Sequence, residues 1–123
     1  MATPDEKVAH ALARLSAAFI AELPDQVRAV EDGMTAWLAA PGEKCLFDVV
    51  SHRVHQLKGS GSTFGCPGIS RAAGILERRL AEYRGEVEQG ERPIANDVVA
   101  AMTQLRSEAE LAGSRPDDKE GGA

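Results

Sequence analysis

The sequence has few aromatic residues, few cysteines and no long apolar run. Phe, Trp and Tyr make up 4% of its 123 residues, and Ala is abundant, which favours helices over a β-sandwich. Cys45 and Cys66 are too few for a disulfide scaffold, so we expect reduced thiols in a cytoplasmic protein. An uncharged apolar run such as residues 33–42 is far shorter than the roughly 20 residues that span a bilayer, and no basic and apolar leader begins the chain.

Negative charges outnumber positive ones. The chain has 14 Lys and Arg against 19 Asp and Glu, a formal net charge of −5, and a surface of this sign repels nucleic acid and anionic lipid. We therefore expect neither a nucleic acid nor a membrane as a partner. The length is that of one domain, which can bury one core without a metal or a disulfide.

Prolines and glycines divide the chain into five segments in which apolar residues recur at helical spacing. The first segment, residues 5–23, is followed by Pro24, which either starts a new helix at its first turn or kinks a continuing one. The later segments run from Pro24 to the Pro41 turn and over residues 43–63, 67–89 and 94–112. No segment alternates with period two for long enough to predict a strand.

These segments predict an all-α fold: an antiparallel up-down-up-down four-helix bundle over residues 24–112, with an additional N-terminal helix at about residues 5–23. Residues 1–112 then form one domain. Residues 113–123 contain no large apolar side chain and are expected to be a disordered tail.

His55 lies on the polar face of the helix expected at residues 43–63. A helical wheel places the apolar residues Leu46, Val50 and Leu57 at about 180–220° from His55. The imidazole should therefore face solvent. The neighbours of His55 on the wheel are Asp48, Ser51, His52, Lys58, Gly59 and Ser62.

The residues beside His55 suit the capture of a phosphoryl group. Gly59 and Gly61 interrupt a helix, where each costs up to about 1 kcal/mol relative to Ala. Gly59 follows His55 by one turn and leaves space beside the ring, and Lys58 brings an ammonium group close to it. A nucleophilic imidazole, a cation and an open approach fit phosphoryl transfer. The simpler alternative is a surface histidine with a solvated lysine, and packing is an alternative reason for the glycines.

Residues 55–65, with the sequence H-Q-L-K-G-S-G-S-T-F-G, resemble the signature of histidine-containing phosphotransfer (HPt) domains. That signature is H-x-L-K-G followed by small residues, an apolar residue and a glycine, and the resemblance extends over about residues 10–112. It implies a helical bundle in which a histidine, here His55, accepts a phosphoryl group from the aspartyl phosphate of a receiver domain and donates it to another receiver. It also implies that Lys58 steadies the phosphoryl charge.

The resemblance further implies a role for Glu77, which follows His55 by 22 residues. The family often has Gln or Glu there, bonded to Nδ1 of the ring, so that Nε2 remains as the nucleophile. A carboxylate resembles the phosphotransfer domains of chemotaxis kinases; a surface charge beside the apolar seam is the alternative. Three residues depart from the family pattern: Val54 replaces a small residue, Arg53 falls at the edge of the apolar stripe, and Gly61 stands where Ala or Ser is common.

The resemblance implies partners and no cofactor. The expected partners are receiver domains of a hybrid histidine kinase and of a response regulator, with Mg²⁺ supplied by the receiver. We expect a monomer that acts as a stoichiometric carrier, because the chain has no G-x-x-x-x-G-K-[ST] loop for ATP. The residues expected in the docking footprint are Ser51, His52, Gly59, Gly61 and Ser62.

Two other functions fit parts of the sequence. A helical adaptor would bind a receiver or a histidine kinase without accepting phosphate, and the chain could also be a fragment of a larger kinase. No metal site is expected, because Cys45 and His52 share a helix face but lie two turns, about 10 Å, apart. His10 lies outside any motif and is expected on the surface.

Overall fold

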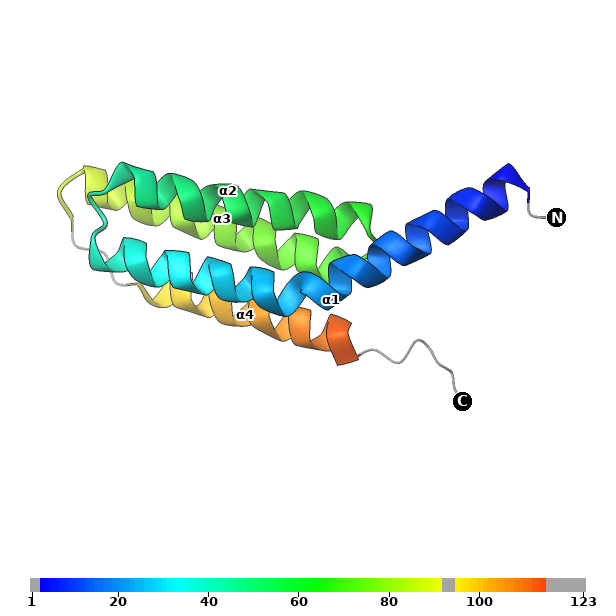
Figure 1. Cartoon of the computed structure of the whole chain (residues 1–123). Coiled ribbons are helices and arrows are strands. Elements are labelled where there is room, and N and C mark those ends of the chain that lie inside the picture. The colour runs from blue at the N-terminus through cyan, green and yellow to red at the C-terminus, as the bar shows by residue number, and fades with distance from the viewer. Residues whose placement is uncertain (1–2, 92–94, 115–123) are drawn as a thin grey trace.

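The computed structural model describes residues 3–91 and 95–114, and within them it contains helices and no strand. The helices are α1 (Pro4–Ala39), α2 (Lys44–Thr63), α3 (Pro67–Glu88) and α4 (Asn96–Ser114). Consecutive helices run in opposite directions (Figure 1), and α1 and α3 each pack against both α2 and α4. The prediction of an all-α fold with four helices packed together is confirmed.

The prediction of a separate N-terminal helix is wrong. Helix α1 continues through Pro24, although proline has no N–H to donate to the carbonyl of Ile20. Pro24 is exposed, whereas Leu23 and Val27 on either side of it are buried. Burial of the face on which these two residues lie holds the helix together across the missing hydrogen bond.

The start of α1 is defined by a capping box. The Thr3 hydroxyl accepts a hydrogen bond from the backbone N–H of Glu6 at 3.1 Å, and the Glu6 carboxylate accepts one from the N–H of Thr3 at 2.8 Å. Pro4 follows at the first helical position, where no N–H is required. These local interactions stabilise an end of α1 that lies outside the bundle (Figure 1).

A glycine closes the turn between α2 and α3. Gly65 has φ of 77°, a left-handed conformation that favours glycine. The following N–H, of Cys66, donates to the carbonyl of Gly61 at 2.8 Å, and Pro67 then begins α3. This short turn sets α2 and α3 side by side.

The core runs along the bundle axis. At the end where α1 meets α2, the Trp37 ring lies 5.2 Å from both the Phe47 and the Tyr83 rings, measured between centroids. Its Nε1–H donates to the carbonyl of Pro41 at 3.3 Å. Aromatic pairs of this kind contribute about 0.5–1.5 kcal/mol each beyond the area they bury.

The buried stripe of α2 is turned by roughly 40° from the predicted one. Leu46 is only partly buried, whereas Phe47 and Val54 are buried. Val54 therefore fills the core, and Arg53 lies outside it with an exposed side chain. This accounts for the departures from the family pattern at Val54 and Arg53.

Helix α4 continues to Ser114, two residues beyond the predicted end of the domain. The remainder of the tail predicted to be disordered, residues 115–123, lies outside the described residues. Among the described helices, none is long and apolar enough to cross a membrane.

Candidate functional site

His55 projects from the middle of α2 into solvent. Its side chain is 68% exposed, and its Nδ1 lies 2.7 Å from Oε2 of Glu77 on α3, a side chain that is only 28% exposed. The two residues are 22 positions apart in the chain, and the packing of α2 against α3 brings them together. No hydrogen bond to Nε2 occurs within residues 3–91 and 95–114.

Lys58 binds the second oxygen of the same carboxylate. Its Nζ donates to Oε1 of Glu77 at 3.2 Å. A Cβ atom added to Gly74 would lie 3.7 Å from Cε of Lys58, so the aliphatic part of the lysine crosses α3 over a residue without a side chain. Gly74 was not predicted from the sequence, where it stands out only as a small residue about one turn before Glu77.

The Glu77 carboxylate fixes the roles of the ring nitrogens. Partial burial raises the pKa of Glu77. The hydrogen bonds from His55 and Lys58, together with the charges of these groups, lower the pKa by a larger amount, so it lies below its ordinary value of 4.5. An ionised carboxylate only accepts hydrogen bonds, so Nδ1 must carry the hydrogen. In the neutral ring Nε2 is then the atom with a free lone pair, and it faces solvent.

The two glycines of the motif have different roles. A Cβ atom at Gly59 would meet no atom within 4 Å, so nothing inside the protein requires glycine there. At Gly61 it would lie 2.8 Å from the backbone nitrogen of Ser70 and 3.1 Å from Cγ2 of Ile69. Gly61 is buried and lets α2 approach α3. We therefore correct the expectation that Gly61 touches a partner: it belongs to helix packing.

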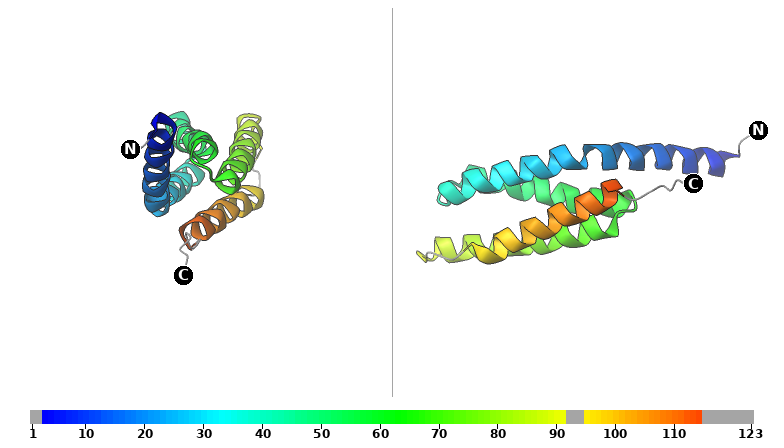
Figure 2. Two further views of the ribbon diagram at one scale, coloured as in Figure 1. Left: turned by 90° about the vertical axis from the view of Figure 1, so that its right-hand side faces the viewer. Right: turned by 90° about the horizontal axis from the view of Figure 1, so that it is seen from below.

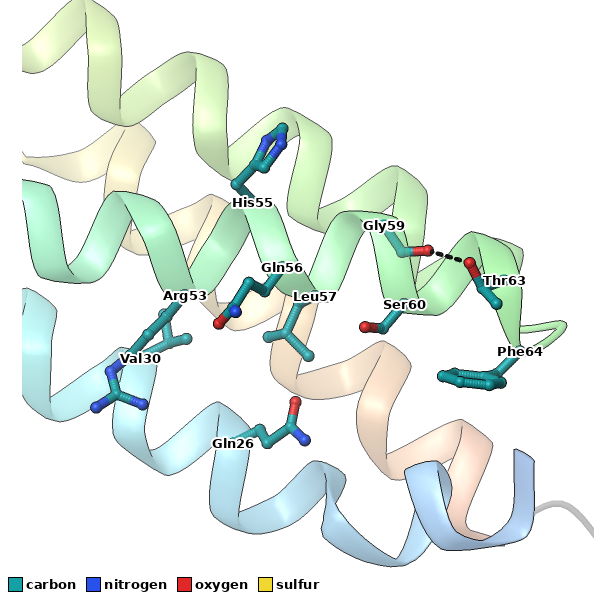
Figure 3. Close-up of a pocket in the computed structure, with 10 residues that line it drawn as sticks. All are labelled: Gln26, Val30, Arg53, His55, Gln56, Leu57, Gly59, Ser60, Thr63 and Phe64. Carbon is teal, nitrogen blue, oxygen red and sulfur yellow. Dashed lines mark hydrogen bonds between the residues drawn. The ribbon is translucent and has the colours of Figure 1, made fainter. Parts of the chain in front are cut away.

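An open groove runs along the α1 side of His55 (Figure 3). It has a volume of about 710 Å³ and is lined by residues of α1 and α2 together with Phe64. Arg53 extends from α2 towards α1 in this groove, and Gln26 lies in the groove on the α1 side. His55, at the rim of the groove, points away from α1. Gln26 and Gln56 were not predicted from the sequence, because the groove that they line forms only where α1 packs against α2.

The family model of the Hpt domain matches residues 14–112. The chain belongs to the Hpt domain family. Hpt domains act as phosphotransfer carriers in phosphorelays and interact with receiver domains. The resemblance found in the sequence over about residues 10–112 is thereby confirmed. Comparisons with curated proteins and with solved structures gave no match.

Three further residues of this Hpt domain were expected near a partner. His52 and Ser62 are exposed, and Ser51 is partly buried. All three lie on α2 within two turns of His55, on the face that carries the imidazole. They belong with Gly59 to the surface that a partner approaching Nε2 would meet.

His10 and the cysteines lie apart from His55, Glu77 and Lys58, or are buried. Across the described ranges, no group of three or more His, Cys, Asp or Glu side chains is placed to hold a metal ion. Cys45 is exposed on α2 and Cys66 is buried. His10 is exposed on α1, as expected. The side chains that the structure brings together around an exposed imidazole are those of His55, Glu77 and Lys58.

Proposed function

We propose that this Hpt domain carries a phosphoryl group on Nε2 of His55. The group comes from the aspartyl phosphate of a receiver domain in a hybrid histidine kinase and passes to the receiver of a response regulator. The observation that supports this best is the 2.7 Å contact between Nδ1 of His55 and the Glu77 carboxylate. It gives the exposed Nε2 the lone pair that a nucleophile needs.

The transfer step follows from this geometry. The Nε2 lone pair attacks the phosphorus atom of the aspartyl phosphate in line with the bond that breaks. The N–P bond forms while the bonding electrons of the P–O bond leave with the aspartate, which becomes a free carboxylate. The hydrogen stays on Nδ1, and Glu77 stabilises the positive charge that develops on the ring. The same steps in reverse deliver the group to the next aspartate.

Lys58 offsets the charge of the phosphoryl group. Its side chain is 47% exposed and is held by one contact to Glu77, with its stem over Gly74. Once the group is on Nε2, its oxygens compete with Glu77 for the ammonium. We infer that Lys58 then turns from the carboxylate towards the phosphoryl oxygens. Breaking the ion pair between Lys58 and Glu77 costs little free energy, because an exposed ion pair contributes only about 0–1 kcal/mol.

The partner docks on α2, around His55. Gly59 leaves space for its approach, and Ser51, His52 and Ser62 lie in the footprint. Arg53 and the adjoining groove extend this surface towards α1. The receiver brings its own aspartate and Mg²⁺, so the carrier needs no cofactor. A small and transient interface suits a carrier that must leave each partner after transfer.

A labelling experiment tests the proposal. The full chain is incubated with Mg²⁺ and with receiver domains of the same genome charged by acetyl phosphate. We expect an acid-labile, base-stable label on the chain, which is lost in His55→Gln and kept in the control His10→Gln, an exposed histidine on α1 outside the docking footprint. Receivers that bind the chain without labelling it would instead support the adaptor function, and a label that survives in His55→Gln would move the acceptor to another residue.

A further inference from the structure

The N-terminal part of α1 extends beyond the end of the bundle. We call residues 4–18 the arm. None of its side chains is buried, and the first buried residue of α1 is Phe19. Figures 1 and 2 show the arm projecting past the ends of the other three helices. At about 1.5 Å per residue, the arm is roughly 22 Å long.

The arm carries an apolar seam that is left exposed by the described residues. Val8, Leu12 and Leu15 are 59%, 46% and 53% exposed and recur at intervals of four and three residues. The seam continues without a change of face into the buried stripe of α1, which begins with Phe19 and Leu23. The arm extends a helix that is already formed and capped, but it buries none of its side chains, so a partner surface on its apolar residues would stabilise it further.

We propose that the partner is the arm of a second copy of this chain, packed antiparallel about a twofold axis. In this arrangement Val8 of one arm lies opposite Leu15 of the other, and the two Leu12 side chains meet near the axis. Each arm extends past the ends of α2, α3 and α4 of its own chain, so its seam is uncovered there. In the dimer, the partner's arm packs against this uncovered seam. The contact is closed, so it yields dimers and no filament.

The residues beside the seam favour self-pairing over a partner selected by charge. Over residues 8–18 the flanking positions are small and uncharged, being Ala9, Ala11, Ser16 and Ala18, and the charged Asp5 lies beside the seam only at the far end of the arm. Within residues 8–18 only Arg14 carries a formal charge, and it lies about 130° from the seam. Two identical surfaces therefore meet without facing like charges, and the small residues permit close approach of the helices.

The small size of the arm predicts a weak dimer. Stable interfaces bury about 1,200–2,000 Å² in total, which two arms with three large apolar side chains each do not reach. The dissociation constant should then exceed about 1 µM. This inference replaces the monomer expected from the sequence. The pairing surface lies beyond the end of α2 and leaves the face of His55 open.

Sedimentation equilibrium of the full chain, from roughly 10 µM to 1 mM, tests the pairing. We expect the weight-average mass to rise from that of one chain towards that of two. Leu12→Glu should abolish the rise, and the matched control Val99→Glu, an equally exposed apolar residue on α4, should leave it unchanged. A monomer at every concentration, or a dimer that survives Leu12→Glu, would overturn the proposal.

Disulfide cross-linking tests the antiparallel geometry, in a Cys45→Ser background. Under mild oxidation Leu12→Cys should give a linked dimer, because the two positions meet near the axis. Val8→Cys should not, because its two copies lie about 12 Å apart along the axis. Equal linking at both positions would indicate a parallel pair and contradict the antiparallel packing of the two arms. Neither test depends on whether His55 accepts phosphate.

Discussion

The Glu77 carboxylate joins His55 to Lys58 across the interface between α2 and α3. One oxygen lies 2.7 Å from Nδ1 of His55 and the other 3.2 Å from Nζ of Lys58. A single side chain therefore sets the tautomer of the proposed nucleophile and binds the lysine that is proposed to offset the charge of the phosphoryl group. The first predictions follow from separating these two tasks.

Glu77→Gln should separate tautomer control from charge. The amide oxygen still accepts from Nδ1–H, so ¹⁵N NMR should find the hydrogen on Nδ1 as in the parent chain. Glu77→Ala removes the acceptor, and we expect the rate of phosphoryl transfer to fall by about 10–100-fold, the usual effect of losing a group that orients a reactive histidine. Glu86→Gln, an exposed residue on α3, is the control. A rate unchanged in Glu77→Ala would remove Glu77 from the mechanism.

Lys58→Ala should affect transfer and spare stability. An exposed ion pair contributes about 0–1 kcal/mol, so the free energy of unfolding should change by less than that. The initial rate of labelling by a charged receiver should fall by about tenfold or more, because the developing charge loses its cation. Urea unfolding and the labelling assay measure the two effects. A large loss of stability with a normal rate would instead make Lys58 a structural residue.

Gly59→Ala and Gly61→Ala should change stability in opposite directions. At Gly59 the methyl group meets open space, so the gain in helix propensity should raise the free energy of unfolding by about 0.5–1 kcal/mol. At Gly61 it meets the backbone of α3, and overpacking should lower that free energy by about 1–3 kcal/mol. Urea unfolding measures both variants.

The same glycines also separate docking from packing. Gly59→Gln should keep the fold while its side chain weakens receiver binding, measured by calorimetry. Unchanged receiver binding in Gly59→Gln would place the docking surface elsewhere.

The lowered pKa of Glu77 predicts an acid-dependent contribution to stability. Because its pKa in the folded chain lies below 4.5, the unfolded chain binds this proton first as the pH falls. The contribution is therefore complete above the unfolded value and is lost as the pH falls through the folded one. The difference in unfolding free energy between the parent chain and Glu77→Gln should be constant near neutral pH and shrink below about pH 4.5. A difference that grows on acidification would contradict the pairing.

The sequence predicted those parts of the site that depend on spacing along one helix. His55, Lys58 and Gly59 are separated by one turn or less, so their shared face follows from helical geometry. Glu77 required the family resemblance, because its meeting with His55 depends on the packing of two helices. Gln26 and Gly74 were missed for the same reason: they reach the site from other helices.

Two errors of prediction also trace to tertiary packing. Local propensity predicts a boundary at Pro24, but burial of Leu23 and Val27 carries the helix through it. Composition treats Gly59 and Gly61 alike, yet only the second faces α3. The predicted apolar stripe included Leu46 and left out Val54, and this obscured the difference. A rotation of roughly 40° in the buried face is within the error of a stripe defined by few residues.

The most direct test of the account is to locate the phosphoryl group on the protein. The chain is labelled with ¹⁵N, phosphorylated by a charged receiver, and examined by long-range ¹H–¹⁵N and ³¹P NMR at neutral to basic pH. We expect phosphorus bonded to Nε2 of His55, with the hydrogen retained on Nδ1. Phosphorus on Nδ1, or on His52 or His10, would contradict it, because the Glu77 hydrogen bond would then not select the nucleophile.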